Sequence, residues 1–345
     1  MRATCRHNRL ATMLVGALAL VPTFAEAGEI GHYAGGFVNI RDYLVPDPGF
    51  YAGVYNYFYT TDQLNDSAGN KIKSVTINPP GGGPGVTVGV DVNVDMYVVA
   101  PTFIYVTDVK PLGIKYGALI APNFANANLD AEFSAATEHG GNLSSSLSNF
   151  GAGDMFVQPV WLGKTLAHWD FALAYGFYAP IGKYNTETVT VPGIGPVKAE
   201  SADNLGFGFW TQQIQGSVAW YPWADKRLAV VTALTYEVNG KKQDFDVTPG
   251  DNLSLNWGIS QFLPLKKDHT LLLEVGPAGY DTWQITDDTG SAANNTRDQV
   301  HAVGGQVSLV HLPWHAALTC HGFYEFAGQD RFQGGTFGIS LTKKF

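Results

Sequence analysis

The sequence predicts an all-β fold, a transmembrane antiparallel β-barrel of about twelve strands. Three observations predict it. Short segments alternate apolar with polar residues, and the short and long connections between them follow one another in strict succession. Beyond the amino-terminal segment, no run of about 18 apolar residues could form a membrane-spanning helix. The 40 glycines and an aromatic content of 13% also suit alternating strands, so we exclude a helical membrane protein.

The amino-terminal residues predict a secretory signal peptide. Three arginines within the first nine residues precede an apolar run from Leu10 to Val21, and the small-residue sequence Ala-Glu-Ala ends at Ala27. A run of about 12 apolar residues is too short for the ~30 Å hydrocarbon core, which argues against an uncleaved anchor. We therefore expect residues 1–27 to be removed, and the mature chain, which begins at Gly28, to reach the outer membrane of a Gram-negative bacterium.

Charge and cysteine content exclude several classes of protein. Removal of residues 1–27 takes away three arginines and one glutamate, so the formal net charge changes from −9 to −11. An acidic protein is a poor partner for nucleic acid, whose phosphates require basic patches. Cys320 is then the only cysteine, which excludes an intrachain disulfide and a cysteine-rich zinc site. No phosphate loop, calcium loop or paired-histidine motif is present, so we expect no metal and no other cofactor.

Residues 50–345 are expected to form the barrel. The alternation is clearest at residues 90–98, where four valines and Met96 alternate with Asp91, Asn93, Asp95 and Tyr97. We expect the apolar face of each strand to meet lipid and the polar face to meet the lumen. The same pattern predicts strands at residues 50–59, 91–107, 113–123, 153–166, 169–180, 204–221, 228–239, 253–263, 269–284, 297–312, 315–326 and 334–345.

Connection lengths support a barrel over a soluble β-sandwich. Bacterial barrels join their strands by short periplasmic turns and long outer loops, and a sandwich has no reason to sort its loops in this way. Short turns are predicted at residues 108–112, 167–168, 222–227, 264–268 and 313–314. Long connections fall near residues 60–90, 124–152, 181–203 and 240–252, and shorter outer ones near 285–296 and 327–333. With both termini on the short-turn side, the number of strands must be even.

Aromatic residues mark the predicted membrane boundary. Four of the eight tryptophans lie beside the short turns, where an indole ring can bury its body and keep its N–H wet: Trp169, Trp220, Trp223 and Trp314. The last strand alternates apolar residues up to a terminal Phe345, a pattern that the outer-membrane assembly machinery recognises. Lys343 departs from this pattern, but its long stem can carry the ammonium to the headgroups. Outer-membrane lipid and the assembly machinery are therefore expected partners.

The segment between the signal peptide and the barrel, residues 28–49, does not alternate and contains Pro46 and Pro48. It is therefore not expected to form a strand. Two interpretations remain open. The segment could fold into the lumen as a plug, with Phe37, Arg41, Asp42 and Tyr43 as candidate plug residues, or it could be a disordered periplasmic leader.

A resemblance to a known family begins at this segment. A proline-rich turn is followed by the tyrosine-rich stretch from Phe50 to Tyr59 and then by the sequence Leu64-Asn65-Asp66. Over about residues 32–70 the chain resembles the meta-pathway phenol-degradation-like family of outer-membrane transporters. The resemblance implies uptake of a small hydrophobic or aromatic compound.

Ionisable residues on the polar faces of strands are candidates for the transport path, because lipid exposure of a charged side chain is costly. The candidates are Asp95, Glu237, Glu274, Glu325 and His321, which shares a face with Glu325. An acidic lumen would repel anions and admit cations or neutral molecules. The alternative is that these groups only form hydrogen bonds across a water-filled interior.

The first strand places four tyrosines on one face, Tyr51, Tyr55, Tyr57 and Tyr59. These rings could line a path for an aromatic solute, which each would bind by offset stacking. They could instead face lipid as part of an interfacial girdle.

The function that these features favour is passive uptake of a small solute through a barrel, without enzymatic activity. A barrel hydrolase needs a serine and a histidine oriented together, and Ser340 and His321 lie on neighbouring predicted strands at unknown relative depth. A lipid-modifying barrel enzyme and a structural barrel with a sealed lumen therefore stay open as alternatives.

Overall fold

The computed structural model describes residues 30–77, 86–109, 111–135, 142–191, 195–201, 203–293 and 296–345. The predicted signal peptide, residues 1–27, lies outside the described residues. Within the described ranges, no helix is long and apolar enough to cross a membrane.

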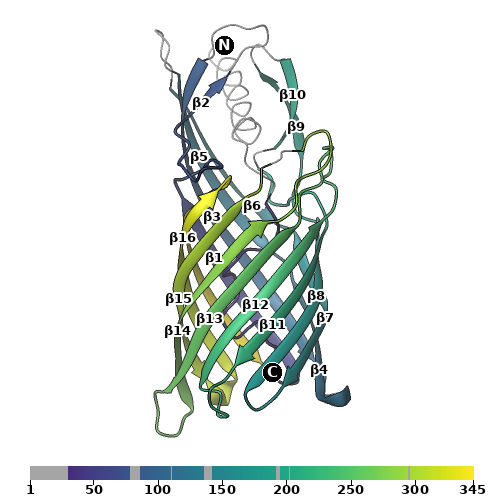
Figure 1. Cartoon of the computed structure of the whole chain (residues 1–345), viewed down its shortest axis with the longest axis vertical. Helices are drawn as coiled ribbons and strands as arrows, with labels where there is room; N and C mark the ends of the chain where they lie inside the picture. The colour runs from purple at the N-terminus through teal and green to yellow at the C-terminus, as the bar shows by residue number, and fades with distance from the viewer. Residues whose placement is uncertain are drawn as a thin grey trace, which may run out of the picture.

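The described chain folds into a closed antiparallel barrel (Figure 1). Its strands are β1 Gly49–Thr61, β2 Ser74–Ile77, β3 Val86–Val106, β4 Ile114–Ala121, β5 Phe124–Ala135, β6 Asn142–Ala152, β7 Met155–Thr165, β8 Trp169–Ala179, β9 Thr186–Val191, β10 Gly195–Glu200, β11 Thr211–Trp220, β12 Leu228–Asn239, β13 Asn252–Pro264, β14 Leu271–Gln284, β15 Gln299–His311, β16 Ala316–Gln329 and β17 Gly335–Lys344. Two short 3₁₀ turns, η1 Pro111–Gly113 and η2 Leu312–Trp314, occupy connections.

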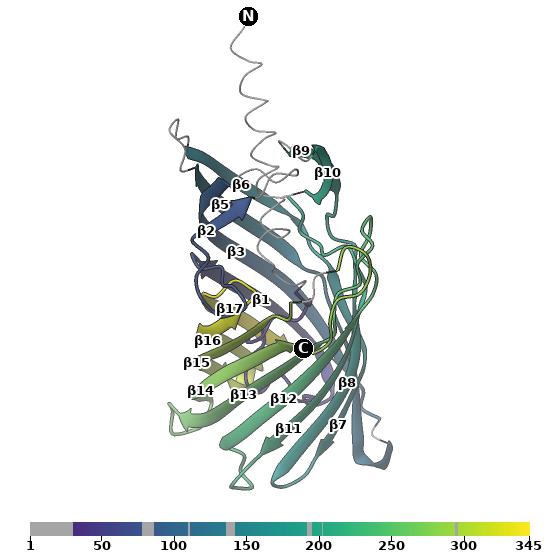
Figure 2. The ribbon, with the colours of Figure 1, turned by 45° about the horizontal axis from the view of Figure 1, so that its top comes forward.

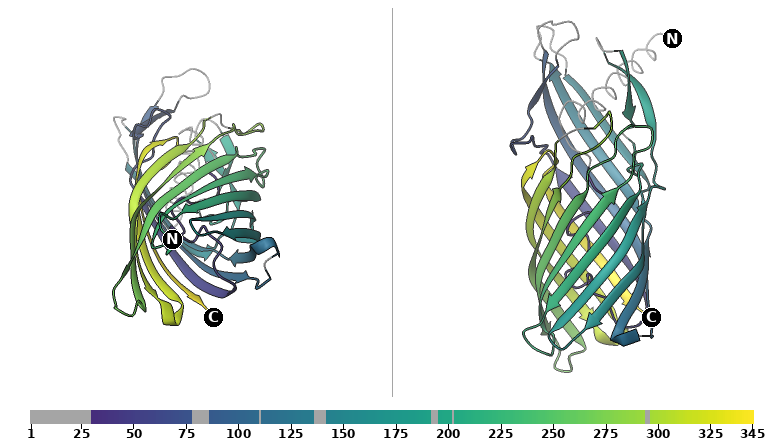
Figure 3. Two further views of the ribbon diagram at one scale, coloured as in Figure 1. Left: turned by 60° about the horizontal axis from the view of Figure 1, so that its bottom comes forward. Right: turned by 45° about the vertical axis from the view of Figure 1, so that its right-hand side comes forward.

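The sheet closes because β1 pairs with β17 on one side and with β3 on the other. β4 and β5 continue one another along β3, and β6 and β7 do the same along β5 and β4. β2 is an extension that pairs with β3, and β9 and β10 form a separate hairpin. The cylinder built by the described residues thus has twelve strands, as the sequence predicts, and they wind around it at a common tilt (Figure 3).

The alternation along each strand sorts side chains between the two faces of the wall. On β12, Ala233 and Glu237 face the interior and are 1% and 2% exposed, whereas Leu234 faces outward and is 47% exposed. Outward residues of other strands, among them Val303 and Leu341, are likewise apolar and exposed. An apolar outer face around a polar inner face is the arrangement that a lipid bilayer requires of a barrel.

The short connections all lie at one end of the cylinder, which we call the short-turn end (Figure 1). The four tryptophans expected at the membrane boundary are exposed at this end, and the rings of Trp169 and Trp220 lie 6.4 Å apart. The terminal Phe345 is also exposed there, with its ring 6.0 Å from that of Phe50. Loop sorting and the aromatic boundary therefore agree with the sequence prediction.

Several predicted boundaries were wrong. β3 begins at Val86 and not at residue 91, and the connections expected at residues 60–90 and 181–203 contain β2 and the hairpin of β9 and β10. Residues 124–152, expected as an outer loop, contain β5 and β6, and the strand expected from residue 204 begins at Thr211. β2, β3, β5 and β6 rise together on one side of the long-loop end (Figure 2). β3 has 21 residues, about twice the 9–11 that cross a bilayer. A strand that leaves the membrane needs no lipid-facing apolar row, so hydrophobic alternation did not reveal β5 and β6, although it did reveal residues 90–98 of β3.

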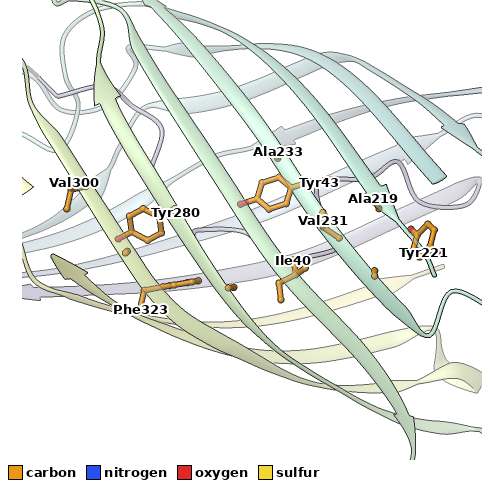
Figure 4. Packing of buried hydrophobic residues seen from close by; sticks show 12 residues of the cluster. Ile40, Tyr43, Ala219, Tyr221, Val231, Ala233, Tyr280, Val300 and Phe323 are labelled. Carbon is orange, nitrogen blue, oxygen red and sulfur yellow. The ribbon is translucent and has the colours of Figure 1, made fainter. Parts of the chain in front are cut away.

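The segment of residues 30–48 lies inside the cylinder, and we call it the plug segment. Its Ile40 and Tyr43 pack with inward residues of several strands, including Val231, Ala233 and Tyr280 (Figure 4). Gly36 allows the chain to turn there. Its φ is +69°, and a Cβ atom would lie 2.8 Å from the ring of Phe323. Of the two interpretations left open by the sequence, the inward-folded segment is the one observed.

Candidate functional site

A cavity of about 680 Å³ lies between the plug segment and the barrel wall. Its lining includes both ends of the plug segment and inward side chains of strands on every side of the barrel. Fourteen aromatic residues contribute to the lining: Tyr33, Phe37, Tyr43, Tyr51, Tyr55, Tyr57, Tyr59, Phe156, Trp161, Tyr178, Phe207, Tyr221, Tyr280 and Phe332. Such a lining can bind an apolar or aromatic molecule through ring contacts and excluded water.

The four tyrosines of β1 all face this cavity. The outward positions of the same strand carry Phe50, Val54 and Phe58, which are exposed, so the lipid-facing alternative does not apply to the tyrosines. Tyr55 donates a hydrogen bond of 2.8 Å to Asp42, and the ring of Tyr57 lies 5.5 Å from that of Phe37. The tyrosine row therefore both lines the cavity and contacts the plug segment.

Two further tyrosine hydroxyls of this row form hydrogen bonds. Tyr51 donates to the carbonyl oxygen of Asp47 at 2.5 Å. Tyr59 donates to Glu325 at 3.1 Å. The hydroxyls of Tyr51, Tyr55 and Tyr59 are thus directed at protein partners, so these three residues offer chiefly their rings to the cavity.

Arg41 and Glu274 join the plug segment to the wall near the short-turn end. The Nε atom of Arg41 lies 3.2 Å from Oε1 of Glu274 and 2.7 Å from Oγ of Ser260. The guanidinium also stacks over the ring of Phe262, 4.2 Å from its centre. Glu274 further accepts a bond from Gln306, whose side-chain oxygen accepts from the backbone N–H of Ile40. Glu274 faces inward as predicted, but it is a partner of the plug segment and not an open lumen charge.

The other two predicted glutamates also face inward. Glu325 is 3% exposed and accepts hydrogen bonds from Tyr59, Tyr280 and the backbone N–H of Gly334. Glu237 is 2% exposed, and its Oε2 atom accepts from the backbone N–H of Tyr33 at 3.2 Å. Both carboxyl groups line the cavity.

Asp95 was placed on the wrong face. On β3 the even-numbered residues face inward, among them the buried Ala100 and Thr102. The odd-numbered Asp95 lies on the opposite face, which it shares with the exposed Phe103. It lies in a shallow outer groove together with Phe58 and Phe337. The valine row of this segment faces inward instead. The upper part of β3 rises beyond the length needed to cross a bilayer, so its outer face can be polar.

His321 and Ser340 face the interior but do not form a pair. Ser340 forms a hydrogen bond of 3.0 Å with the amide nitrogen of Asn39. Neither ring nitrogen of His321 has a hydrogen-bond partner among the described residues. Its ring lies 5.7 Å from that of Phe323 instead. The serine and histidine considered for hydrolysis are therefore not arranged as nucleophile and base.

Sequence reasoning missed the contact at the other end of the plug segment. His32 bonds through Nε2 to Oδ2 of Asp154 at 2.9 Å and through Nδ1 to Oγ of Thr211 at 2.8 Å. Its ring stacks on Tyr178, 4.7 Å between centroids. Asp154 lies in the break between β6 and β7 and also accepts from the backbone N–H of Phe207. The partners His32 and Asp154 are 122 residues apart, and no local pattern indicates such a contact.

No cluster of three or more histidine, cysteine, aspartate or glutamate side chains suited to a metal ion occurs within the described ranges. The cavity is lined by aromatic rings, aliphatic side chains, hydroxyls, amides and a few buried charged groups. Such a lining can bind and orient a small molecule.

Comparisons with known proteins agree with this architecture. An outer membrane channel from Pseudomonas putida F1 is similar in structure, with a TM-score of 0.57 and 15% identity over 89% of this chain and 100% of that one. The beta domain of the Bordetella autotransporter BrkA has a TM-score of 0.45 and 11% identity over 87% of this chain and 100% of that one. A FadL homologue of Pseudomonas aeruginosa has a TM-score of 0.39 and 10% identity over 93% and 98%. At these identities only the first similarity is informative, and it concerns the fold.

No curated protein matches the sequence. A family model described as "Putative MetA-pathway of phenol degradation" matches residues 61–341. This range begins near the end of β1 and extends almost to the end of β17, so it covers nearly the whole barrel. The chain therefore belongs to this family, in agreement with the resemblance seen in its first strand and the loop that follows.

Proposed function

We propose that this protein is an outer-membrane channel for passive uptake of small hydrophobic or aromatic compounds. The observation that carries the proposal is the ring-lined cavity enclosed between the plug segment and the wall. The volume of about 680 Å³ is in the range of small-molecule binding sites. The apolar outer wall and the sorted turns support placement in the outer membrane.

In this proposal the plug segment controls passage. It contacts the wall through the apolar packing of Ile40 and Tyr43 and through polar pairs at separate points, among them Arg41 with Glu274 and Asn39 with Ser340. A solute that binds against the tyrosine row would leave toward the short-turn end when the segment shifts from the wall. Passage of this kind is passive, since it requires only thermal motion of a segment that belongs to no strand of the barrel.

Solute uptake by cells tests the proposal. The protein is expressed in a Gram-negative host that lacks its own hydrocarbon channels, and the initial uptake of labelled toluene is measured against an empty-vector strain. We expect faster uptake with the protein present. Equal rates, with the barrel shown to be folded in the outer membrane, would instead indicate a structural barrel with a sealed lumen.

A cross-linked variant tests the role of the plug segment. The side chains of Asn39 and Ser340 are in contact, so cysteines are placed at both positions in a Cys320→Ser background, and formation of the disulfide is verified by mass spectrometry before uptake is measured. We expect the oxidised form to lose the toluene uptake and the reduced form to regain it. The Cys320→Ser protein alone is the control, and oxidation should leave its uptake unchanged. Full uptake by the cross-linked form would show that the segment does not move during passage.

A further inference from the structure

Three hydrogen-bond acceptors lie side by side on the inner wall. Gln213 on β11 is the cross-strand partner of Glu237 on β12, and Glu237 is in turn the partner of Asn252 on β13. The three side chains line the cavity and are 3%, 2% and 2% exposed. We call them the acceptor row. Neighbouring positions of one face lie about 5 Å apart across strands, so a single small molecule can reach more than one of them.

Each member of the acceptor row presents a buried oxygen atom that no described protein group satisfies. These atoms are Oε1 of Gln213, Oε1 of Glu237 and Oδ1 of Asn252. The Nδ2 atom of Asn252 donates to the carbonyl oxygen of Gly250 at 3.2 Å, which sets the orientation of its amide. Among the described residues no lysine, arginine or histidine forms an ion pair with Glu237. Buried acceptors normally have a donor, so three unsatisfied oxygens in one row require an explanation.

The surroundings of the row are aromatic. Tyr33 bonds through its backbone N–H to the second oxygen of Glu237, and the rings of Tyr33 and Tyr178 line the same cavity. A ligand that satisfies the row therefore needs a flat apolar body for the rings and at least one O–H or N–H group for the oxygens.

We propose that the acceptor row binds the hydroxyl or amino group of an aromatic solute, and that the channel prefers such solutes to hydrocarbons of the same size. The inference rests on the proposed function, since it assigns a polar subsite within the same cavity. A site built to accept a hydrogen bond disfavours an analogue without the donor, because its oxygens are then desolvated without a partner.

Binding of three matched solutes tests the inference. Phenol, aniline and toluene have the same size, and only toluene lacks a donor. Their affinities for the mature protein are measured by titration calorimetry in lipid nanodiscs, with empty nanodiscs as the blank. We expect phenol, aniline or both to bind roughly tenfold or more tightly than toluene. A larger gain for phenol or for aniline identifies whether a hydroxyl or an amino group fits the row.

Two variants test whether the acceptor row causes the preference for phenol or aniline over toluene. Glu237→Met removes the central acceptor and keeps an apolar side chain of similar length, and it should bring the affinities of the three solutes close together. Gln213→Met is the second variant, because its side-chain oxygen accepts no hydrogen bond from the described part of the plug segment, and it should weaken the preference in part. Asp95→Asn is the matched control on the outer wall and should leave all three affinities unchanged.

The outcomes separate the two proposals. Tight binding of toluene without preference for phenol or aniline would overturn the acceptor row and leave the proposed function in place. Failure of all three solutes to bind would contradict the proposed function, in which the cavity binds aromatic compounds. A preference that persists in both folded variants, Glu237→Met and Gln213→Met, would also overturn the acceptor row.

Discussion

Individual buried charges decide how the plug segment is held. Arg41 and Glu274 are both largely shielded from solvent, with side-chain exposures of 19% and 7%. Removal of one partner of such a pair leaves the other charge buried and unpaired, which costs on the order of 3 kcal/mol. The bonded position of Glu274 also revises the expectation that this residue contributes an open acidic charge to the lumen. Substitution of Glu274 should therefore weaken the attachment of the plug segment to the wall.

Arg41→Met should release the plug segment more often, because Glu274 then lies buried without its cation. We expect longer or more frequent open events in single-channel recordings from planar bilayers. The double variant Arg41→Met with Glu274→Gln removes both charges and should restore part of the closed behaviour. Arg297→Met, at an exposed pair in an outer loop, serves as the control. Identical recordings for wild type and Arg41→Met would show that this pair does not hold the segment.

At the scale of elements, the plug segment and the barrel wall depend on different interactions. The wall is closed by the backbone ladder of β1 with β17 and β3, to which the plug segment contributes no strand. The plug segment is held by side-chain contacts, with His32 at one end and Arg41 at the other. Loss of the segment should therefore change the pore without opening the cylinder.

Deletion of residues 30–44 tests this separation. We expect the shortened protein to migrate still as a folded, heat-modifiable barrel in gel electrophoresis, at a lower unfolding temperature, because Ile40 and Tyr43 no longer pack on the inner wall. Its single-channel conductance should rise well above that of the wild type. A shortened protein that fails to fold would indicate that the wall needs the segment as a core.

The outer loops form a second element-scale unit. Asp246 accepts bonds from Lys241 and from the backbone and hydroxyl of Ser291, and thereby joins the loop after β12 to the loop after β14. Thr248 and Thr289 form a backbone bridge beside it. The bond from Lys241, with those from Ser291, holds the pKa of the Asp246 carboxyl well below its usual range.

Asp246→Asn should loosen these loops at neutral pH. A carboxyl with a lowered pKa contributes its contact above the usual aspartate pKa of about 4 and loses it only as the pH falls through the lowered value. We therefore expect the wild-type loops to resist proteolysis equally at pH 7 and pH 5, and the variant to be cut faster at both. Asp225→Asn, in a short turn at the opposite end, is the control. Equal cleavage of wild type and Asp246→Asn would contradict the role of this contact.

At the scale of the whole molecule, the cylinder is completed by pairing its first strand with its last. Phe345 follows β17 directly, and its backbone N–H donates to the carbonyl oxygen of Phe50 at 2.9 Å. Its exposed ring lies beside the membrane boundary at the short-turn end. We propose that the assembly machinery recognises this terminal residue before the barrel closes.

Phe345→Ser should slow assembly in cells and leave the finished channel unchanged. We expect less folded protein in the outer membrane, whereas the same variant refolded in detergent should conduct and bind solutes as the wild type does. Leu312→Ser, at another exposed apolar position in the short-turn region, is the control for surface polarity. Normal assembly of Phe345→Ser would exclude the terminal ring as the recognised feature.

The sequence by itself determined the barrel. Alternation with a period of two and the sorting of turns are local properties. Together they predicted the twelve strands and a shared face for the four tyrosines of β1. They also predicted that Glu237, Glu274, His321 and Glu325 face inward. These predictions succeed because each strand must satisfy lipid on one face wherever it crosses the membrane.

Only the tertiary structure decided which face of β3 carries Asp95, where residues 30–48 lie, and which buried groups meet. Alternation shows that a strand has two faces, but it does not show where the membrane ends, and above that level a polar row can face outward. Arg41 and Glu274 are 233 residues apart, and the acceptor row spans three strands. Contacts of this kind depend on strand register and on closure of the cylinder, which are properties of the whole chain and not of any local segment.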